Sequence, residues 1–168
     1  MKPFKNIPGY STDYSVSKDG CVRGPRKILK PSHDSDGYRT VNVKDINGKF
    51  VTRKVSRLVA LAFKKNPTNL PIADHENRVR HFDDESNIRW VDNVCNSLNN
   101  DSDGVTEVIN RTKPFRARVG YDGKVFNLGY FKTRAEATKK SRELREILFN
   151  IRYRAITYNE DSRSPCLC

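Results

Sequence analysis

The sequence has no long apolar run and few hydrophobic residues. Only 36% of its 168 residues are hydrophobic, which favours small modules over one large core. No stretch reaches the roughly 18 apolar residues of a membrane span, and the start, MKPFKNIPGY, lacks the apolar segment of a signal peptide. We therefore expect a cytoplasmic protein that is not secreted and makes no membrane contact.

Cysteines are few and badly spaced for metal binding. Cys21 and Cys95 are isolated, and Cys166 and Cys168 lie close to the end of the sequence. We expect four free thiols in a reducing compartment. A zinc site that combines Cys166 and Cys168 with a remote histidine is the minor alternative.

Acidic residues are fewer than basic residues in this sequence. The chain holds 32 Lys and Arg against 20 Asp and Glu, a formal net charge of +12. Residues 1–50 hold ten basic against five acidic side chains and residues 104–154 thirteen against five, whereas residues 51–103 are balanced at eight each. Two basic flanks favour a polyanionic partner, of which DNA and RNA are the commonest. A basic protein with no specific partner is the alternative.

Residues 8–55 have the pattern of β-strands. Two short strands flank KDG, and YRTVNVKD leads through INGK to FVTRKV, which predicts a hairpin with Asn-Gly in its turn. The period then changes to that of a helix with one apolar face, ended by Asn66-Pro67. The apolar positions of this helix are Val55, Leu58, Val59, Ala62 and Phe63.

Two short strands and a capped helix are predicted next. PIAD at 71–74 and IRWV at 88–91 have strand character, and the only tryptophan, Trp90, is expected in the core. Asp92 predicts the cap of a helix from Asn93 to about Leu98.

The C-terminal third begins after NNDSDG, the best linker in the chain. FRARVGYDGKVFNLGYF predicts strands around a DG turn, with Gly129 interrupting the last of them. Thr133 and Glu136 form a capping box before a long helix. Three strands and one helix are therefore expected here.

Asp74, His75, Asn87 and Asn96 can meet in one cleft if the strand pair packs on the following helix. Asp74 and Asn96 offer hard oxygen ligands for a divalent ion, Mg²⁺ (or Mn²⁺). Histidine is the side-chain type suited to deprotonate water near neutral pH, which makes His75 the candidate base, and Asn87 can orient its imidazole. The alternative is a polar loop with an exposed His75.

VSRLVALAFKKNP, ADHENR and SNIRWVDNVCNS together resemble the HNH nuclease module of phage and intron homing endonucleases, a ββα-metal fold. The resemblance implies that Asp74 and Asn96 bind one metal ion, that His75 is the general base and that Asn87 positions it. The sequence departs from the family pattern after Asp-His, where ENRVRHFDD replaces a loop with Asp-Gly-Asn, and at Ser56, where histidine is common.

The flanking segments resemble DNA-contacting modules that accompany this nuclease. IPGYSTDYSVSKDGCVR is similar to a small N-terminal module, with Phe4 near the position of its usual tryptophan. Residues 104–149 resemble an AP2-type domain, in which a three-stranded sheet enters the major groove and a helix packs behind it.

The expected fold is therefore α+β and modular. Its parts are an N-terminal β-rich DNA-contacting module at 1–50, an HNH nuclease module at 51–100, an AP2-like DNA-binding domain at 101–154 and a disordered tail at 155–168.

Basic and aromatic side chains in both flanks are candidates for DNA binding, with simple solvation as the alternative. In the AP2-like segment, Arg116 and Arg118 point to the same side of one strand, which predicts a sheet face that contacts the groove. The candidates are Arg23, Arg26, Lys27, Arg116, Arg118, Lys124 and Tyr130.

The sequence thus predicts a site-specific, divalent-metal-dependent HNH endonuclease of the homing type, acting as a monomer on double-stranded DNA in the cytoplasm of a phage host. One cleft per monomer predicts a nick in one strand unless the protein dimerises or rebinds. The alternatives are a catalytically inactive, sequence-specific DNA-binding protein or regulator, favoured by the altered loop, and an RNA-binding protein, disfavoured by the lack of RRM or KH motifs.

Overall fold

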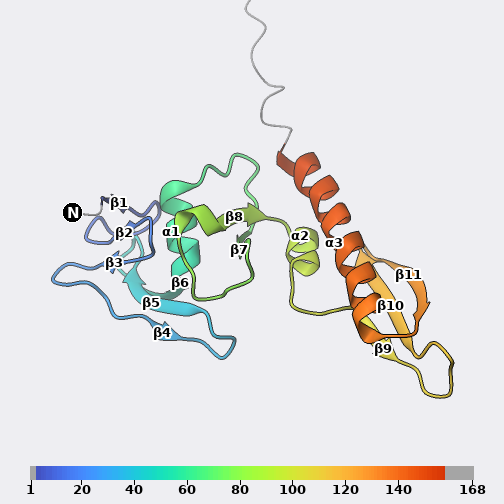
Figure 1. Cartoon of the computed structure of the whole chain (residues 1–168). Helices are drawn as coiled ribbons and strands as arrows, with labels where there is room; N and C mark the ends of the chain where they lie inside the picture. The colour runs from blue at the N-terminus through green and yellow to red at the C-terminus, as the bar shows by residue number, and fades with distance from the viewer. Residues whose placement is uncertain (1–2, 158–168) are drawn as a thin grey trace, which may run out of the picture. The chain divides into compact units, whose positions relative to one another are not determined.

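The computed structural model describes residues 3–157, and contacts between residues divide the chain into two compact units, Met1–Val91 and Asp92–Cys168. Helices and small antiparallel sheets occur in both units (Figure 1). The predicted α+β fold class is confirmed. None of the helices within the described range combines the length and the apolar character that a membrane crossing requires.

Within residues 3–91, the first unit holds three small sheets, one α-helix and one 3-10 helix. Its elements are β1 (Phe4–Asn6), β2 (Ser15–Ser17), β3 (Val22–Arg23), β4 (Ser32–His33), β5 (Arg39–Lys44), β6 (Phe50–Lys54), α1 (Val55–Phe63), β7 (Ile72–His75), η1 (Glu85–Asn87) and β8 (Ile88–Val91). The sheets have the orders β1-β2-β3, β4-β5-β6 and β7-β8. The predicted strands, hairpin and helix of this region are therefore confirmed.

The turn between β5 and β6 shows how local chemistry sets these elements. The Asp45 side chain accepts hydrogen bonds from the backbone N–H groups of Asn47 and Lys49, both at 2.9 Å. Gly48 follows with a φ of 79°, a conformation that costs glycine little. The Asn-Gly turn predicted from INGK is present.

One hydrophobic core joins the elements of the first unit. β6 runs into α1 without a break between Lys54 and Val55. Trp90 is 5% exposed, as its predicted place in the core requires, and its Nε1–H donates to the backbone oxygen of Lys64 at 3.4 Å. The buried core residues are Ile7, Tyr14, Val16, Val22, Val41, Val43, Val55, Leu58, Val59, Ala60, Ile88 and Trp90.

Within residues 92–157, the second unit holds a three-stranded sheet and two helices. Its elements are α2 (Asn93–Leu98), β9 (Val105–Glu107), β10 (Phe115–Tyr121), β11 (Lys124–Phe131) and α3 (Arg134–Thr157). The sheet order is β11-β10-β9, so β10 is central, and α3 packs on this strand. The predicted three strands and helix of the AP2-like segment are confirmed.

Helix caps in the second unit form where the sequence predicts them. The Asp92 side chain accepts from the N–H of Cys95 at 2.8 Å. In the capping box, Glu136 N–H donates to Thr133 Oγ1 at 3.2 Å, and Thr133 N–H donates to Glu136 Oε2 at 3.3 Å. These bonds satisfy N–H groups that lack partners inside the helix.

The β10–β11 hairpin turns at Asp122 and Gly123, whose φ angles are 49° and 75°. Two consecutive positive φ values suit a tight two-residue turn between twisted strands. Farther along, Ala117 pairs with Gly129 whereas Arg118 pairs with Asn127. The residue left over is Leu128, so the predicted interruption near Gly129 is a β-bulge.

The predicted tail at 155–168 needs a correction at its start. α3 continues through Thr157, so residues 155–157 are helical and not disordered. The aromatic rings of Phe149 and Tyr153 stack at 5.5 Å, one helical turn apart, and Thr157 Oγ1–H donates to the oxygen of Tyr153 at 2.7 Å. These contacts support another helical turn. Residues 158–168 lie outside the described residues.

The unit boundary after Val91 differs from both predicted module boundaries. α2 belongs to the C-terminal unit because Cys95 and Leu98 are buried there and Asp92 pairs with Arg152 at 2.8 Å. Burial opposes the charge of Asp92, but hydrogen bonds from Cys95 and Arg152 outweigh it and lower the pKa of this carboxyl. The division into three modules stays a prediction.

Candidate active site and nucleic-acid interface

Asp74 and His75 lie at the end of β7, opposite β8. Asp74 pairs with Arg89 and His75 with Ile88 across the two strands. Because successive side chains on a strand point to opposite faces, His75 shares the face of buried Ile88 and Trp90, and Asp74 shares the face of Arg89. The adjacent pair in the sequence is thus divided between two faces of the sheet.

Asp74 is tied to its cross-strand neighbour. The Arg89 Nε–H donates to Asp74 Oδ2 at 3.1 Å, and Arg89 NH1 lies 3.7 Å from Glu76 Oε1. Asp74 is 8% exposed. The carboxylate that the sequence assigns to a metal therefore has a cation beside it in this state of the protein.

His75 is buried, with 3% of its side chain exposed. Its Nε2 is hydrogen-bonded to Oδ1 of Asp83 at 2.9 Å, and Asp83 itself is 2% exposed. The ring of Tyr38 lies 5.7 Å away, tilted by 32°. The alternative of an exposed His75 on a polar loop is wrong, because the loop folds back and buries the imidazole against a carboxylate.

Asn87 closes the loop of residues 76–86. Its Oδ1 accepts from Asn77 N–H at 3.0 Å, its Nδ2 donates to the Phe82 oxygen at 2.8 Å, and its backbone oxygen accepts from Glu76 N–H at 2.9 Å. All of these bonds go to the loop. The imidazole of His75 is hydrogen-bonded to Asp83, which the sequence did not single out.

The loop of residues 76–86 makes its turn without the glycine that the family pattern supplies. Arg78 has a φ of 64°, the left-handed conformation that side chains disfavour. Its N–H donates to the His75 oxygen at 3.0 Å, and Val79 N–H donates to Asn77 Oδ1 at 2.8 Å. An Asn-centred turn thus replaces the missing glycine.

The far end of this loop docks on the N-terminal strands. Glu85 N–H donates to the Lys18 oxygen at 2.6 Å, and the Glu85 side chain pairs with Lys64 at 3.0 Å and Lys18 at 3.4 Å. The hydrogen bond from Lys64, with the charges of both lysines, lowers the pKa of Glu85 against the opposing effect of burial.

Asp83 packs on a glycine of the turn after β2. A Cβ added at Gly20 would lie 2.9 Å from the Asp83 Cβ, and Gly20 has a φ of 78°. Arg39, on β5, reaches both: its NH1 lies 3.4 Å from Asp83 Oδ2, and its NH2 donates to the Gly20 oxygen at 3.4 Å. The loop therefore depends on the N-terminal strands for its position.

Two cations lie over the ring of Tyr38 near the Asp74-His75 pair. Lys54 Nζ is 3.3 Å and the Arg80 guanidinium 5.5 Å from the ring centroid. Burial raises the pKa of Tyr38, the charge of Arg80 opposes that rise and the charge of Asp74 adds to it. The sequence did not predict this cluster, whose members come from separate segments.

Asn96, the second predicted metal ligand, lies on α2 in the other unit. Its side chain is exposed, and its N–H donates to the Asp92 oxygen within the first helical turn. Its pairing with Asp74 on one metal ion stays a prediction.

The N-terminal candidates for DNA binding are exposed. Arg23 lies on β3, with its guanidinium 4.0 Å from the centroid of the Phe4 ring. Arg26 and Lys27 occupy a turn closed by the bond from Gly24 N–H to the Lys27 oxygen at 2.9 Å. All three side chains can reach a partner on this surface.

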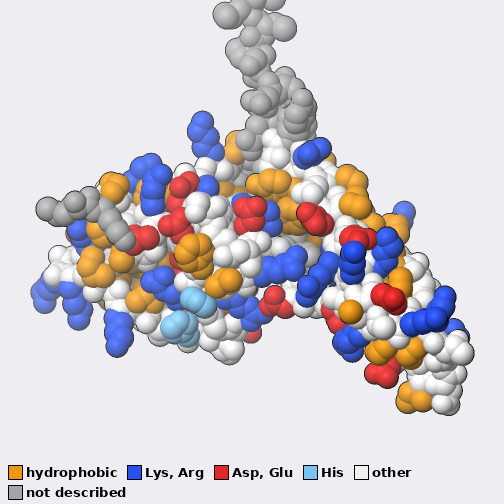
Figure 2. Space-filling model, in the orientation of Figure 1, with side chains coloured by type: hydrophobic (Ala, Val, Ile, Leu, Met, Phe, Trp, Pro, Cys, Tyr) orange, Lys and Arg blue, Asp and Glu red, His pale blue; other side chains and the backbone are white. Residues whose placement is uncertain are grey.

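Arg116 and Arg118 lie on the face of the sheet that points away from α3. Ala117 and Val119 between them are fully buried, and strand alternation places the arginines on the opposite side. Tyr130 pairs with Arg116 across the strands. On the face drawn in Figure 2, Lys and Arg side chains occur over both units with Asp and Glu among them.

The same face includes two polar residues that the sequence reasoning missed. Asn127 pairs with Arg118, and the guanidinium of Arg111 lies 4.3 Å from the centroid of the Tyr130 ring. The pairing of Asn127 with Arg118 could have been predicted from the register of the hairpin, but the bulge shifts that register by one residue.

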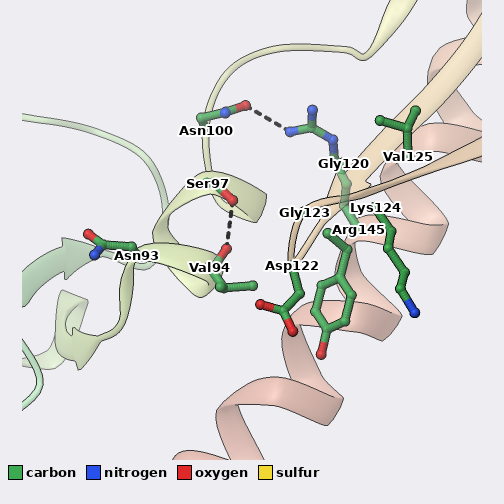
Figure 3. Close-up of a pocket in the computed structure, with 11 residues that line it drawn as sticks. Asn93, Val94, Ser97, Asn100, Gly120, Asp122, Gly123, Lys124, Val125 and Arg145 are labelled. Atoms are coloured by element: carbon green, nitrogen blue, oxygen red, sulfur yellow. Dashed lines mark hydrogen bonds between the residues drawn. The ribbon is translucent and has the colours of Figure 1, made fainter.

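Lys124 lies apart from Arg116 and Arg118. It pairs with Tyr121 and so takes the other face of the hairpin, where it lines an open pocket of about 520 Å³ with Asn93 and Ser97 of α2. Figure 3 shows these residues on either side of the pocket, with Arg145 donating to Asn100 Oδ1 at 2.7 Å. The role of Lys124 in DNA binding stays a prediction.

Comparisons with known proteins show what the chain is similar to. The family described as the NUMOD4 motif matches residues 4–44, the segment that includes β1 to β5. Two curated proteins that match most of the chain are named as endonucleases. The chain is thus similar to viral endonucleases of the HNH type.

The particular relatives are viral. The uncharacterized HNH endonuclease L245 of Acanthamoeba polyphaga mimivirus is 31% identical over 117 residues, 67% of this chain and 32% of that protein. The DNA endonuclease I-HmuI of Bacillus phage SP01 is 33% identical over 107 residues, 62% of this chain and 61% of that protein. The chain thus spans about a third of the length of one relative and three fifths of the other.

One solved structure, described as "DNA binding and cleavage by the HNH homing endonuclease I-HmuI", is also similar to the chain. The likeness covers 54% of this chain and 52% of that one, with 33% sequence identity and a TM-score of 0.48.

Gly20→Ala should loosen the loop by pushing on Asp83. Gly37 has a comparable φ of 84° with no atom within 4 Å of an added Cβ, so Gly37→Ala reports the backbone strain alone. We expect Gly20→Ala to lower the unfolding free energy by about 1–3 kcal/mol more than Gly37→Ala, measured by urea denaturation. Equal losses would show that the Gly20–Asp83 contact is not tight.

The Glu85 ion pairs should stabilise the fold only when Glu85 is charged. Its folded pKa lies below the ordinary value of 4.5, so its contribution is complete above that pH and disappears as the pH falls through the folded pKa. We expect Glu85→Gln to lose about 0.5–1 kcal/mol of unfolding free energy at pH 7 and less than this at pH 3. Exposed Glu107→Gln is the control; a loss at pH 3 equal to that at pH 7 would contradict the assignment.

Proposed function

We propose that the chain is a site-specific HNH endonuclease that hydrolyses a phosphodiester bond of double-stranded DNA with the help of a divalent metal ion. The observation that carries this proposal is the placement of Asp74 and His75 at one strand end, with the imidazole of His75 fixed by a buried carboxylate. The names of the viral relatives support the same activity. We further propose that it acts as a monomer in the cytoplasm of a phage host.

His75 would serve as the general base. The imidazole accepts a proton from a water molecule while the water oxygen forms a bond to phosphorus and the bond from phosphorus to the 3′ oxygen breaks. The products are a 5′ phosphate and a 3′ hydroxyl, whose oxygen takes its proton from solvent. Asn87 would act in this step through the loop that it closes, because its hydrogen bonds hold residues 76–86 over His75.

The donor chemistry for a metal ion fits Mg²⁺ or Mn²⁺. Asp74 supplies a carboxylate and Asn96 an amide oxygen, which are hard ligands, and Mg²⁺ fills its remaining positions with water and phosphate oxygens. Residues 3–157 contain no group of three or more His, Cys, Asp or Glu side chains placed to hold a metal. When bound, the ion would stabilise charge on the phosphate and on the leaving oxygen.

DNA would be held by both basic flanks. Arg116, Arg118 and Tyr130 on one sheet face would contact the groove, and guanidinium groups can grip guanine edges or phosphates. Arg23, Arg26 and Lys27 would contact the backbone from the N-terminal strands. Lys124 would contact a phosphate from the pocket beside α2 instead of the groove.

A DNA-binding protein without catalysis is the second candidate. The observations that favour it are the 3% exposure of the His75 side chain and the Arg89 side chain on Asp74. Such a protein would bind the same DNA and leave it intact.

Metal-dependent cleavage separates the two candidates. Purified protein is incubated with phage genomic DNA and Mg²⁺ or Mn²⁺, and nicks and breaks are mapped by sequencing. We expect cleavage at defined sites that requires the metal, and a rate at least about 100-fold lower for His75→Ala, because general-base catalysis contributes that much or more. DNA affinity should be unchanged in this variant.

The exposed imidazole of His33 provides the matched control, since His33→Ala removes the same group outside the proposed site. If the wild-type protein binds DNA but does not cleave it with either metal, the endonuclease proposal is wrong and the second candidate is supported. Full activity in His75→Ala would remove His75 from the mechanism.

Arg116→Ala combined with Arg118→Ala should weaken DNA binding in a salt-dependent way. If each arginine contacts one phosphate, the slope of log affinity against log salt should become less steep by about 2; a contact with a base edge would instead relax sequence preference. Affinity is measured by fluorescence anisotropy between low and physiological salt. Lys139→Ala with Lys140→Ala, on the exposed side of α3, is the charge-matched control, and equal effects of the two double variants would contradict a groove-facing sheet.

A further inference from the structure

Asp83 lies in the loop of residues 76–86 and contacts the imidazole of His75. Its Oδ1 accepts from His75 Nε2–H at 2.9 Å. The side chains of both residues are at least 97% buried. Because a carboxylate only accepts hydrogen bonds, this contact selects the tautomer of His75 that carries its proton on Nε2.

The second oxygen of Asp83 is buried without a hydrogen bond. Asp83 Oδ2 has no hydrogen-bond partner among the described residues, although Arg39 NH1 lies 3.4 Å away. Arg39 therefore acts on this oxygen through its charge. A buried carboxylate with one unsatisfied oxygen is costly, and such groups in native proteins often serve function more than stability.

The backbone around Asp83 is held on two sides. A Cβ added at Gly20 would lie 2.9 Å from the Asp83 Cβ and 3.1 Å from the Asp83 oxygen, so Asp83 packs closely against this glycine. On the other side, Asp84 accepts from Ser86 N–H at 3.0 Å and caps η1. The carboxylate therefore meets His75 from a fixed position and not from a mobile loop.

We propose that Asp83 is a positioning residue for His75, a role that rests on the proposed endonuclease function. With Nε2–H donated to Asp83, the lone pair of the imidazole lies on Nδ1, and this nitrogen would accept the proton from water. The negative charge of Asp83 also stabilises the imidazolium formed in that step. Arg39, which belongs to the N-terminal strands, keeps the carboxylate in place.

Several other charged or titratable groups surround this pair. Asp74 precedes His75 on β7, and Tyr38 faces its ring from the segment before β5. Lys54 of β6 and Arg80 of the loop lie over Tyr38. Asp83 itself makes a direct hydrogen bond to the imidazole.

The kinetic experiment uses Asp83→Asn in the full-length protein. Asparagine keeps the size of the side chain but loses its charge and can offer an N–H to Nε2, which favours the wrong tautomer. We expect kcat for DNA cleavage to fall about 10- to 100-fold, as for other groups that orient a catalytic histidine from behind. KM and DNA affinity should stay within about twofold, because Asp83 is buried and does not contact DNA.

Asp84→Asn is the matched control. It removes the same charge one residue away, while asparagine retains an oxygen that can cap η1, so cleavage should stay within about twofold of wild type. Wild-type cleavage with an unchanged kcat in Asp83→Asn would overturn the role of Asp83 and leave the endonuclease proposal intact. A wild-type protein that cuts no DNA would overturn the endonuclease proposal, and the catalytic role of Asp83 with it.

A spectroscopic measurement tests the same contact in the wild-type protein, so it does not depend on whether a variant of Asp83 folds. In ¹⁵N-labelled wild-type protein, whose three histidines are His33, His75 and His81, we expect a slowly exchanging Nε2 proton on His75 and a bare Nδ1. His33→Gln and His81→Gln assign the signals. A proton on Nδ1, or an Nε2 proton that exchanges as fast as those of His33 and His81, would overturn the proposal.

Discussion

The buried hydrogen bond from His75 to Asp83 sets the arrangement of the first unit around its site. To bring a carboxylate under the strand end, the loop after β7 must fold back over the imidazole. That fold requires the clamp at Asn87, the left-handed Arg78 and the close contact with Gly20. Each of these features is costly or unusual by itself, and together they hold one side chain in one orientation.

The N-terminal strands therefore do more than add basic surface. Arg39, Gly20 and Lys18 all contact the loop of residues 76–86, and they lie in the segment that matches the NUMOD4 motif. One hydrophobic core also runs from these strands through α1 to Trp90. A segment predicted as a separate DNA-contacting module thus packs against the loop that contacts His75.

The loop that departs from the family pattern is held in place by contacts that the pattern does not include. An Asn-centred turn replaces the expected glycine, and Asp83 supplies the contact to His75 while Asn87 closes the loop. Motif spacing did not predict the hydrogen bond between Asp83 and the imidazole, and the roles of His75 and Asn87 stay predictions.

Local patterns were enough to predict the elements. The alternation around Ala117 and Val119, the helical spacing of Val55 to Phe63, and the caps at Asp92 and Thr133 all depend on neighbouring residues. Local motifs also singled out Asp74 and His75 as candidates. Tertiary packing was needed to see that Asp83 contacts His75, that Lys124 takes another face than Arg116, and that α2 packs with the C-terminal sheet. These outcomes depend on which distant segments share a core, on a bulge that shifts register, and on buried charges that must find partners. Such contacts join residues far apart in the chain, and no local spacing records them.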